Sequence, residues 1–525
     1  MFFIYFIETL RTFTLLLGFF TLLYFNDAFK KQPSIGELLT KRFENEIYKE
    51  FDTLAFDAVF KHSIDSLSHK LSNTQTLGKF YSNNSYHPQL IINFYQNNNL
   101  DSLVSFLQNS EEHGFNPKAF STDELLRLLQ ELKQNKYTHV SQSYATLAKV
   151  ELLAADAYIN YVSYLKFGVV DPRKIFSRYF ITVKRPDSQF AVRLLNSENM
   201  TDTLVGIQHK SSQYKALQVA YLQAENDSIG QILAVNMERL RWVLPPTGEE
   251  YIQVNIPDFN LVYFKQKDTL ATMKVCVGSK ADLDYDQKME HFKKTNNLED
   301  KPNNHETPLL FSSITMCYAN PEWNIPESIA KNEIFPSTLK NRGYLRKNEI
   351  NVFYKNKLVR NPYRIRWSTY SREKLPFRFV QKSGLKNALG KFKFAFENNS
   401  SIYLHDTNNK KAFKFANRAV SHGCIRLEKP LKFAELLVSD KDKYDKLRAE
   451  VGLAPVNNIN KQSVSAKSIE KPKSFVPESM AFTPKKPIPL LITYFTAWEK
   501  NNRIEYRPDV YGLDQKLWLA MNKSR

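Results

Sequence analysis

Ser421-His422-Gly423-Cys424-Ile425-Arg426 is the most informative stretch of the sequence, because it places a thiol beside an imidazole and a guanidinium. A cysteine attacks as the thiolate, and its ordinary pKa of about 8.5 must be lowered by a nearby imidazole, cation or helix N-terminus before it reacts at neutral pH. The glycine before the cysteine has no Cβ, so main-chain N–H groups can approach a developing oxyanion. The stretch therefore predicts acyl transfer by Cys424, with Gly423 at the oxyanion site.

A second imidazole lies upstream, in Tyr403-Leu404-His405-Asp406. His405 and His422 are both candidate bases for the thiol, and Arg426 is a candidate cation. A zinc site made of the two histidines and Cys424 is the alternative, because neutral imidazole and thiolate suit zinc. We predict no metal site and no cofactor, since no fourth ligand follows at a recognisable spacing and the chain has neither Cys-x-x-Cys nor His-Glu-x-x-His.

The order of these residues, a histidine and then Ser-His-Gly-Cys followed by an apolar residue and arginine, resembles the catalytic signature of YkuD-type L,D-transpeptidases, which remodel bacterial peptidoglycan. Further stretches resemble the large, periplasm-facing branch of that family: Val254-Asn255-Ile256-Pro257, residues 320–326, Asn387-Ala388-Leu389-Gly390 with Lys393-Phe394, and residues 490–498. Residues 153–158 and 168–174 resemble the helical scaffold domain of the same proteins. The resemblance covers most of residues 90–520.

The resemblance implies a role for each matched residue of the signature. Cys424 would be the nucleophile and His405 the general base, with Gly423 and Cys424 at the oxyanion site. His422 would shape the loop or polarise the oxyanion, and Arg426 would hold the loop or bind a substrate carboxylate.

Further residues are predicted to contact the substrate because they flank these positions or lie in the matched stretches. They are Tyr403, Asp406, Ser421, Trp323 and Asn324. In relatives, the residue after the base is small and its main-chain carbonyl orients the imidazole; here that residue is Asp406. The basic, aromatic insertion at about residues 327–380 lies where relatives carry a lid over the cleft, and we expect it to clamp an acidic stem peptide.

The implied reaction has two steps. Cys424 attacks the L,D-amide between the third and fourth residues of a tetrapeptide stem, and the terminal D-alanine leaves. A side-chain amine of a second stem then resolves the thioester into a 3-3 crosslink. The same residues would give an L,D-carboxypeptidase if water were the acceptor, or an enzyme that anchors proteins to peptidoglycan. A non-catalytic wall-binding protein is a further alternative, disfavoured by the intact signature.

Composition limits the other partners. The net charge of +19 and the pI near 9.4 predict an anionic partner, either peptidoglycan carboxylates, anionic lipid or nucleic acid. The chain has no helix-turn-helix, zinc-finger or aromatic RNA-binding signature, so we expect no nucleic acid. Three cysteines exclude a disulfide framework, and the neighbours of Cys276 and Cys317 are typical of small buried hydrophobes.

The N-terminus is apolar. Residues 12–25 carry no charge, but as a helix they would span only about 21 Å of a hydrocarbon core of about 30 Å. We predict an uncleaved signal anchor in residues 1–30, with residues 1–29 in the cytoplasmic membrane and the body facing the periplasm, in the cell envelope. The cations at Lys30, Lys31, Lys41 and Arg42 favour the opposite orientation, but long domains are translocated largely regardless of flanking charge.

Two kinds of periodicity predict an α+β multidomain protein. Residues 35–240 are typical of a helical scaffold domain, and two apolar stripes at helical spacing mark its core. The first comprises Leu125, Leu128, Leu129 and Leu132 behind a capping box of Ser121 and Glu124; the second comprises Leu153, Ala157, Tyr161 and Leu165 and ends at Gly168.

From about residue 248 the periodicity shortens, which predicts a mainly-β catalytic domain over residues 248–450. Its strands are expected at residues 251–256, 261–264, 270–277, 309–318, 392–396 and 401–404. Residues 455–487, rich in lysine, serine and proline, predict a linker. Residues 488–525 would then form a C-terminal hairpin segment.

Overall fold

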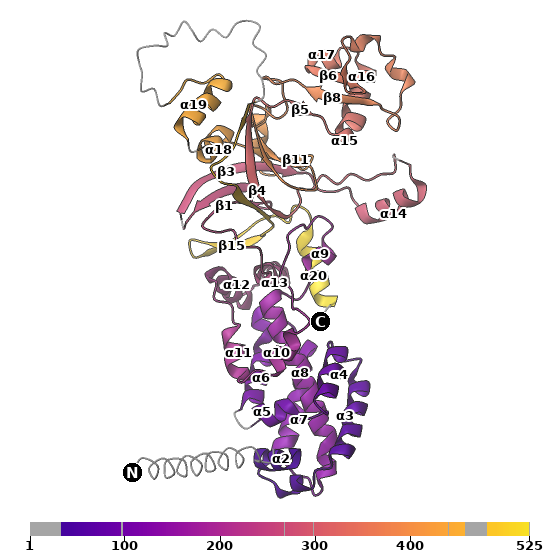
Figure 1. The fold of residues 1–525 in the computed structure, drawn as a ribbon, viewed down its shortest axis with the longest axis vertical. Coiled ribbons are helices and arrows are strands. Elements are labelled where there is room, and N and C mark those ends of the chain that lie inside the picture. The colour runs from indigo at the N-terminus through magenta and orange to yellow at the C-terminus, as the bar shows by residue number, and fades with distance from the viewer. Residues whose placement is uncertain are drawn as a thin grey trace, which may run out of the picture. The chain divides into compact units, whose positions relative to one another are not determined.

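The computed structural model describes residues 33–95, 98–266, 268–297, 299–438, 440–456 and 480–523 (Figure 1). The chain folds into two compact units, Met1–Leu165 with Pro186–Gln208 and Lys166–Arg185 with His209–Arg525. The expected helical range of residues 35–240 therefore contributes to both units. The expected anchor at residues 1–30 lies outside the described residues, and among those described no helix is both long and apolar enough to cross a bilayer.

The first unit is helical throughout. Its elements are α2 (Ile35–Phe43), η1 (Glu46–Glu50), α3 (Thr53–Leu67), α4 (Thr74–Asn83), α5 (Gln89–Phe94), α6 (Asn99–Gln108), η2 (Asn109–His113), η3 (Pro117–Phe120), α7 (Thr122–Gln134), η4 (Val140–Ser143), α8 (Tyr144–Phe167), α10 (Phe190–Leu195) and α11 (Met200–Gly206). Both expected leucine-rich and aromatic stripes, on α7 and α8, are buried in full. The expectation that both stripes belong to the core is thus confirmed.

The start of α7 differs from the expectation. Ser121 adopts a left-handed conformation with φ of 52° and its side chain caps nothing, so the predicted capping box is wrong. Ser121 is also the last residue bonded into the preceding turn, since its N–H donates to the carbonyl of Lys118. Glu124 instead bonds Lys70, with Oε2 2.7 Å from Nζ. A helix does begin at this point, as the pattern predicted. Its N-cap residue cannot adopt the extended backbone that capping requires, because it also closes the turn of η3.

Glu151, on α8, is a buried carboxylate in this helical unit. Its oxygens accept hydrogen bonds from the main-chain N–H groups of Leu90 (2.8 Å) and Ile91 (3.0 Å) and from the hydroxyl of Tyr81 (2.7 Å). The carboxylate thus satisfies free donors at the start of α5, where a negative charge is favourable. Burial nevertheless dominates and raises the pKa of Glu151 from 4.5 to about 7.

The second unit contains a ten-stranded sheet, ordered β11-β3-β12-β10-β9-β4-β14-β1-β2, with β13 on β4. Its strands are β1 (Glu250–Asn255), β2 (Asn260–Lys265), β3 (Asp268–Gly278), β4 (Leu310–Ala319), β9 (Phe392–Phe396), β10 (Leu404–His405), β11 (Ala419–Ser421), β12 (Ile425–Leu427), β13 (Met480–Phe482) and β14 (Ile488–Thr493). Because β2 also pairs with β3, the sheet closes on itself and leaves few exposed edges. The mainly-β expectation is confirmed.

Helices and a hairpin surround this sheet. They are α9 (Pro172–Ile175), α12 (Ser212–Leu222), α13 (Asp227–Arg241), α14 (Tyr285–Thr295), η8 (Lys410–Lys414), α18 (Pro430–Leu437), α19 (Lys441–Glu450), α20 (Leu513–Lys523) and the hairpin β15 (Ala497–Lys500) and β16 (Arg503–Tyr506). Asn501 and Asn502 form the hairpin turn with φ of 54° and 61°, as their residue types predict.

The C-terminal part of the chain does more than form this hairpin. Residues 488–493 form β14, which lies inside the main sheet, parallel to β1 and antiparallel to β4. Of the expected linker, residues 457–479 lie outside the described residues. Its end is ordered as β13, which pairs with β4.

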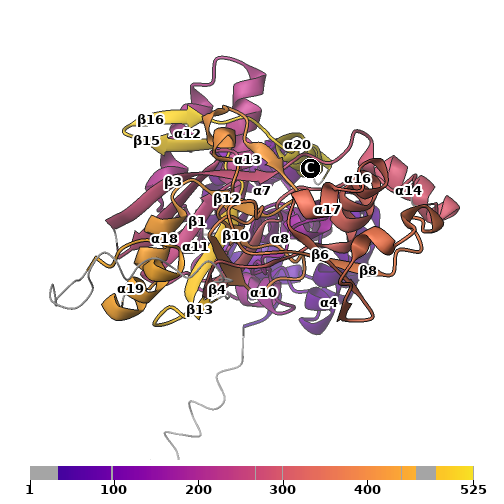
Figure 2. The ribbon, with the colours of Figure 1, turned by 90° about the horizontal axis from the view of Figure 1, so that it is seen from above.

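The insertion expected as a lid forms a small subdomain with its own core (Figure 2). A four-stranded sheet, ordered β5-β8-β6-β7, comprises β5 (Trp323–Asn324), β6 (Ile350–Tyr354), β7 (Lys357–Leu358) and β8 (Phe377–Gln381). The helical elements α15 (Glu327–Ile329), η5 (Ala330–Ile334), α16 (Phe335–Lys340), α17 (Tyr344–Lys347), η6 (Pro362–Arg364) and η7 (Trp367–Thr369) complete it. The core includes Phe335, Val352, Trp367 and Phe379.

Glu151 makes the stability of the helical unit depend on pH. Between about pH 4.5 and 7 the folded state binds a proton that the unfolded chain does not, so stability falls as the pH rises through this window. Relative to Glu151→Gln, the free energy of unfolding of the native protein should fall by about 3 kcal/mol from pH 4.5 to 7.5. Denaturant unfolding at a series of pH values measures this, and parallel profiles for the two proteins would contradict it.

Candidate active site

The pairing of β10 with β12 brings the two signature segments together. The strands are parallel, with Leu404 opposite Ile425 and His405 opposite Arg426. Successive side chains on a strand point to opposite faces. Leu404 and Ile425 are fully buried in the core. The residues on the other face line a cavity: Tyr403, His405, Cys424 and Arg426.

This cavity has a volume of about 630 Å³ and lies between the sheet and the lid subdomain. The sheet side contributes the signature residues with Ser421 and His422, and the lid contributes side chains that include Glu327, Glu333 and Tyr344. The volume falls within the range of roughly 300–1,000 Å³ found for binding pockets. A short peptide therefore fits the cavity.

Cys424 is partly exposed and carries a free thiol. Burial raises the pKa of this thiol from 9.0 to about 11. The main-chain N–H and hydroxyl of Tyr403 and the charges of Lys393 and Arg426 act in the opposite direction and favour the thiolate. The thiol is therefore protonated at neutral pH, and a base must remove its proton as it attacks.

His405 can act as this base because it is neutral. Burial, together with the charges of Arg426, Lys393 and Lys410, lowers the pKa of His405 from 6.5 to about 3. Nδ1 is buried and makes no hydrogen bond of standard geometry within the described part of the chain. The main chain of Asp406 lies close enough to raise the pKa in part. His405 therefore offers an unprotonated nitrogen on the face that carries Cys424.

The turn before the cysteine is fixed by Ser421. Its Oγ accepts a hydrogen bond from the N–H of Gly423 at 3.1 Å and donates one to the carbonyl of Cys424 at 2.5 Å. Gly423 has φ of 111°, a conformation that side-chain-bearing residues rarely adopt. The N–H of Gly423 is thus already bonded, whereas the N–H of Cys424 makes no hydrogen bond among the described residues. Of the two residues expected at the oxyanion site, Cys424 is therefore the one whose N–H is available to a ligand.

Tyr403 and Trp323 lie where the sequence predicted contacts. The hydroxyl of Tyr403 interacts with Cys424 and Trp323, and burial raises the pKa of Tyr403. Its ring lies under Lys393, with Nζ 4.5 Å from the ring centroid, and beside His405, with centroids 5.6 Å apart. Trp323 also lines the cavity. Tyr403 therefore contacts Cys424, His405 and Lys393.

Two predicted substrate contacts lie elsewhere. Asn324 follows Trp323 on β5 and points to the other side, where it accepts a hydrogen bond from Arg378 at 2.8 Å. Asp406 is buried outside the cavity lining and accepts hydrogen bonds from the N–H groups of Lys391 (2.8 Å) and Thr407 (2.7 Å) and from Lys410. A Cβ at Gly390 would overlap this carboxylate, which explains the glycine there. Asp406 holds the chain around His405 and does not contact the substrate site.

His422 faces the lid. Its Nε2 lies 2.7 Å from Oε1 of Glu333, and its ring lies 4.6 Å from that of His305. The contact with His422 lowers the pKa of Glu333. His422 therefore connects the catalytic turn to the lid and is not placed as a second base.

Several residues of the cavity had no predicted role. Lys393 lies opposite His405 on β9 and so faces the same side; it was part of a matched stretch without an assigned role. His305 and Glu333 are isolated in the sequence, and only the tertiary structure brings them to the cavity. The arginine-rich stretches of the lid, at residues 342–346 and 360–366, contribute only Tyr344 to the lining.

The remaining cysteines and metal-binding groups are separate from this site. Cys276 on β3 and Cys317 on β4 are free and buried, as expected for small hydrophobes. In the part of the chain that the structure describes, no three His, Cys, Asp or Glu side chains are grouped in a way that could hold a metal ion.

Comparisons with known proteins identify two domains and a relative of this chain. Residues 249–456 match the family model described as the L,D-transpeptidase catalytic domain (YkuD), and residues 75–220 match the model described as the Scaffold domain. A protein of Haemophilus influenzae named "Putative L,D-transpeptidase" is 27% identical over 394 residues, which cover 72% of this chain and 71% of that protein. The resemblance inferred from the signature and its flanking stretches is confirmed.

The pKa of Cys424 can be measured by alkylation. Because the thiol has a pKa of about 11, its rate of reaction with iodoacetamide should still rise between pH 9 and 10. Lys393→Met removes a charge that lowers this pKa, so it should slow alkylation at pH 9, whereas Lys391→Met, whose ammonium bonds the carbonyl of Val451, should not. Peptide mapping assigns the label to Cys424. An alkylation rate that levels off below pH 9 would show that the pKa of Cys424 is not raised.

Proposed function

From its membership of the L,D-transpeptidase family, shown by its catalytic and scaffold domains, we propose that this chain transfers the acyl group of a peptidoglycan stem peptide through a thioester on Cys424. The observation that supports this most directly is the parallel register of β10 and β12. It places a thiol and a neutral imidazole on one face of the sheet, at a cavity large enough for a peptide.

The first step forms the thioester. His405 takes the proton of Cys424 while the sulfur attacks the carbonyl carbon of the L,D-amide, and the N–H of Cys424 donates to the resulting oxyanion. The imidazolium then gives its proton to the leaving amine of D-alanine. Arg426 and Lys393 make the imidazolium a strong acid, since both lower the pKa of His405. A strongly acidic imidazolium transfers its proton readily to the leaving amine.

The second step depends on the acceptor. We propose that a side-chain amine of a second stem attacks the thioester and gives a 3-3 crosslink. The lid supports an amine acceptor, because the charged side chains that it contributes to the cavity, Glu327 and Glu333, are carboxylates that attract an ammonium group. Clamping of an acidic stem by the arginines of the lid is not supported, since they lie outside the lining. Water or a protein amine as acceptor would give the carboxypeptidase or anchoring activity.

The substrate also suggests the location. Stem peptides lie outside the cytoplasmic membrane, so we propose that the protein works in the cell envelope with its catalytic domain facing the periplasm. The apolar residues 1–29 would attach it to the membrane. The charge of +19 then favours binding to the anionic carboxylates of peptidoglycan.

Mass analysis of the products tests the reaction. The purified protein incubated with tetrapeptide muropeptides should yield a dimer that has lost one alanine, and Cys424→Ala should reduce turnover at least about 1,000-fold because the thioester cannot form without the sulfur. A carbapenem should add to the native protein as an intact-mass shift that is absent from the variant. Residual turnover of a few per cent in a folded variant would contradict the thioester mechanism.

Glu333 should favour the amine acceptor over water. Glu333→Gln removes the carboxylate that faces the cavity, so the ratio of crosslinked dimer to tripeptide should fall about two- to fivefold, the range of a half-exposed ion pair. Glu373→Gln is the matched control, since this carboxylate lies on the same subdomain but outside the cavity lining. An unchanged ratio would show that Glu333 does not select the acceptor.

A further inference from the structure

The carbonyl of Gly423 is held by a buried hydroxyl. Thr307 donates from Oγ1 to this carbonyl at 2.8 Å and accepts from the N–H of Gly278 at 2.8 Å. Thr307 is almost fully buried, and its own N–H donates to the hydroxyl of Tyr511 at 3.1 Å. The hydroxyl of Tyr511 in turn donates to the carbonyl of Gly278 at 2.8 Å. Each hydroxyl thus donates once and accepts once, which fixes the direction of every bond.

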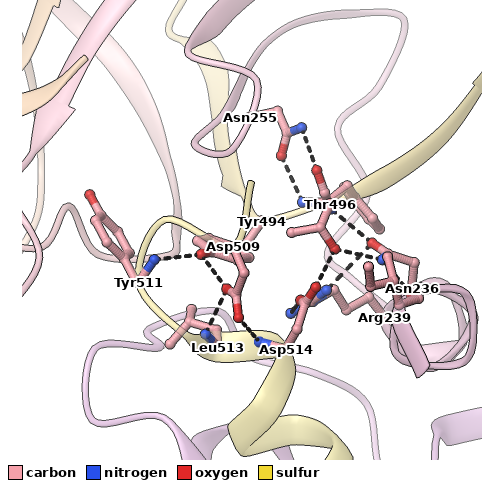
Figure 3. A network of polar contacts seen from close by, with 11 residues as sticks. Asn236, Arg239, Asn255, Tyr494, Thr496, Asp509, Tyr511, Leu513 and Asp514 are labelled. Atoms are coloured by element: carbon pink, nitrogen blue, oxygen red, sulfur yellow. Dashed lines mark hydrogen bonds and ion pairs between the residues drawn. The ribbon is translucent and has the colours of Figure 1, made fainter. Parts of the chain in front are cut away.

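Other residues of the C-terminal segment hold Tyr511 in place. The N–H of Tyr511 donates to the hydroxyl of Tyr494 at 2.7 Å, and that hydroxyl donates to Asp509 at 2.6 Å. Figure 3 shows the carboxylate of Asp509, which also accepts the N–H groups of Leu513 (2.8 Å) and Asp514 (3.0 Å) at the start of α20. Burial raises the pKa of both tyrosines, so each hydroxyl remains protonated.

A second set of bonds fixes the same segment to α13. Asn236 donates to Oγ1 of Thr496 at 2.7 Å and accepts from its N–H at 3.0 Å (Figure 3). Thr496 donates to Asp514 at 2.6 Å, and Arg239 pairs with the other oxygen of that carboxylate at 2.6 Å. These groups are buried, so their positions are tightly determined.

The geometry of one peptide group connects these bonds to catalysis. The carbonyl of Gly423 and the N–H of Cys424 belong to the same planar peptide unit and point in opposite directions. A bond that fixes the carbonyl therefore fixes the direction of the N–H. We propose that Thr307 and Tyr511 are positioning residues that aim the N–H of Cys424 at the oxyanion, with Tyr494 and Asp509 as their support. This proposal rests on the proposed acyl transfer.

Two reagents separate this role from a merely structural one. Acylation of Cys424 by a carbapenem passes through an oxyanion, whereas alkylation by iodoacetamide does not. Thr307→Val should therefore slow acylation roughly 10- to 100-fold, somewhat less than the loss of a whole oxyanion donor. Tyr511→Phe should slow it about three- to tenfold, as one hydrogen bond is lost. Alkylation should stay within about twofold, because neither change alters the charges around the sulfur.

The conservative variant and a distant one complete the experiment. Thr307→Ser keeps the hydroxyl and should restore acylation to within about threefold of the native rate. Tyr263→Phe removes the hydroxyl of another buried tyrosine, bonded to Glu250 at 3.1 Å, and should change neither rate. Equal losses in both reactions, or none in acylation, would overturn the positioning role. A native protein that alkylates but is not acylated by either carbapenem or stem peptide would instead overturn the proposed function.

Discussion

The parallel pairing of β10 with β12 is the constraint on which the site depends. Each strand is only two or three residues long, yet the register decides which side chains face the cavity. A slip of one residue in β10 would turn His405 into the core and Leu404 toward the cavity, so that His405 and Cys424 would lie on opposite faces. The two buried apolar side chains therefore stabilise the arrangement that puts the reactive groups together.

The electrostatics of the site keep both partners neutral at rest. Burial raises the pKa of the thiol and lowers that of the imidazole, so a thiolate–imidazolium pair is disfavoured before substrate binds. The cations Lys393 and Arg426 affect the two groups unequally, since they stabilise a thiolate and destabilise an imidazolium. Charge thus develops mainly during attack, where a preorganised N–H group is most effective.

The sequence predicted those features of the fold and the site that depend on residues close together in the chain. The buried stripes of α7 and α8 follow from helical spacing, and the placement of Cys424 and His405 at one cavity follows from a short signature. The capping box at Ser121 failed because the preceding turn forces its backbone into a left-handed conformation. Asn324 was misplaced because a two-residue strand gives no alternation from which to choose a face. Glu333 and His305 could not be found, since only tertiary packing brings them to His422.

The position of β14 explains how the end of the chain comes to support the catalytic turn. This strand pairs with β1 and β4, which are distant in sequence, and non-local pairing of this kind leaves no trace in local periodicity. Without β14, both neighbours would present unpaired main-chain groups in the middle of the sheet. The chain leaves β14 directly at Tyr494, so closure of the sheet also delivers the hydroxyl on which Tyr511 rests. The C-terminal segment therefore supports the carbonyl of Gly423 through Tyr511 and Thr307, in addition to the bonds that Ser421 makes within the turn.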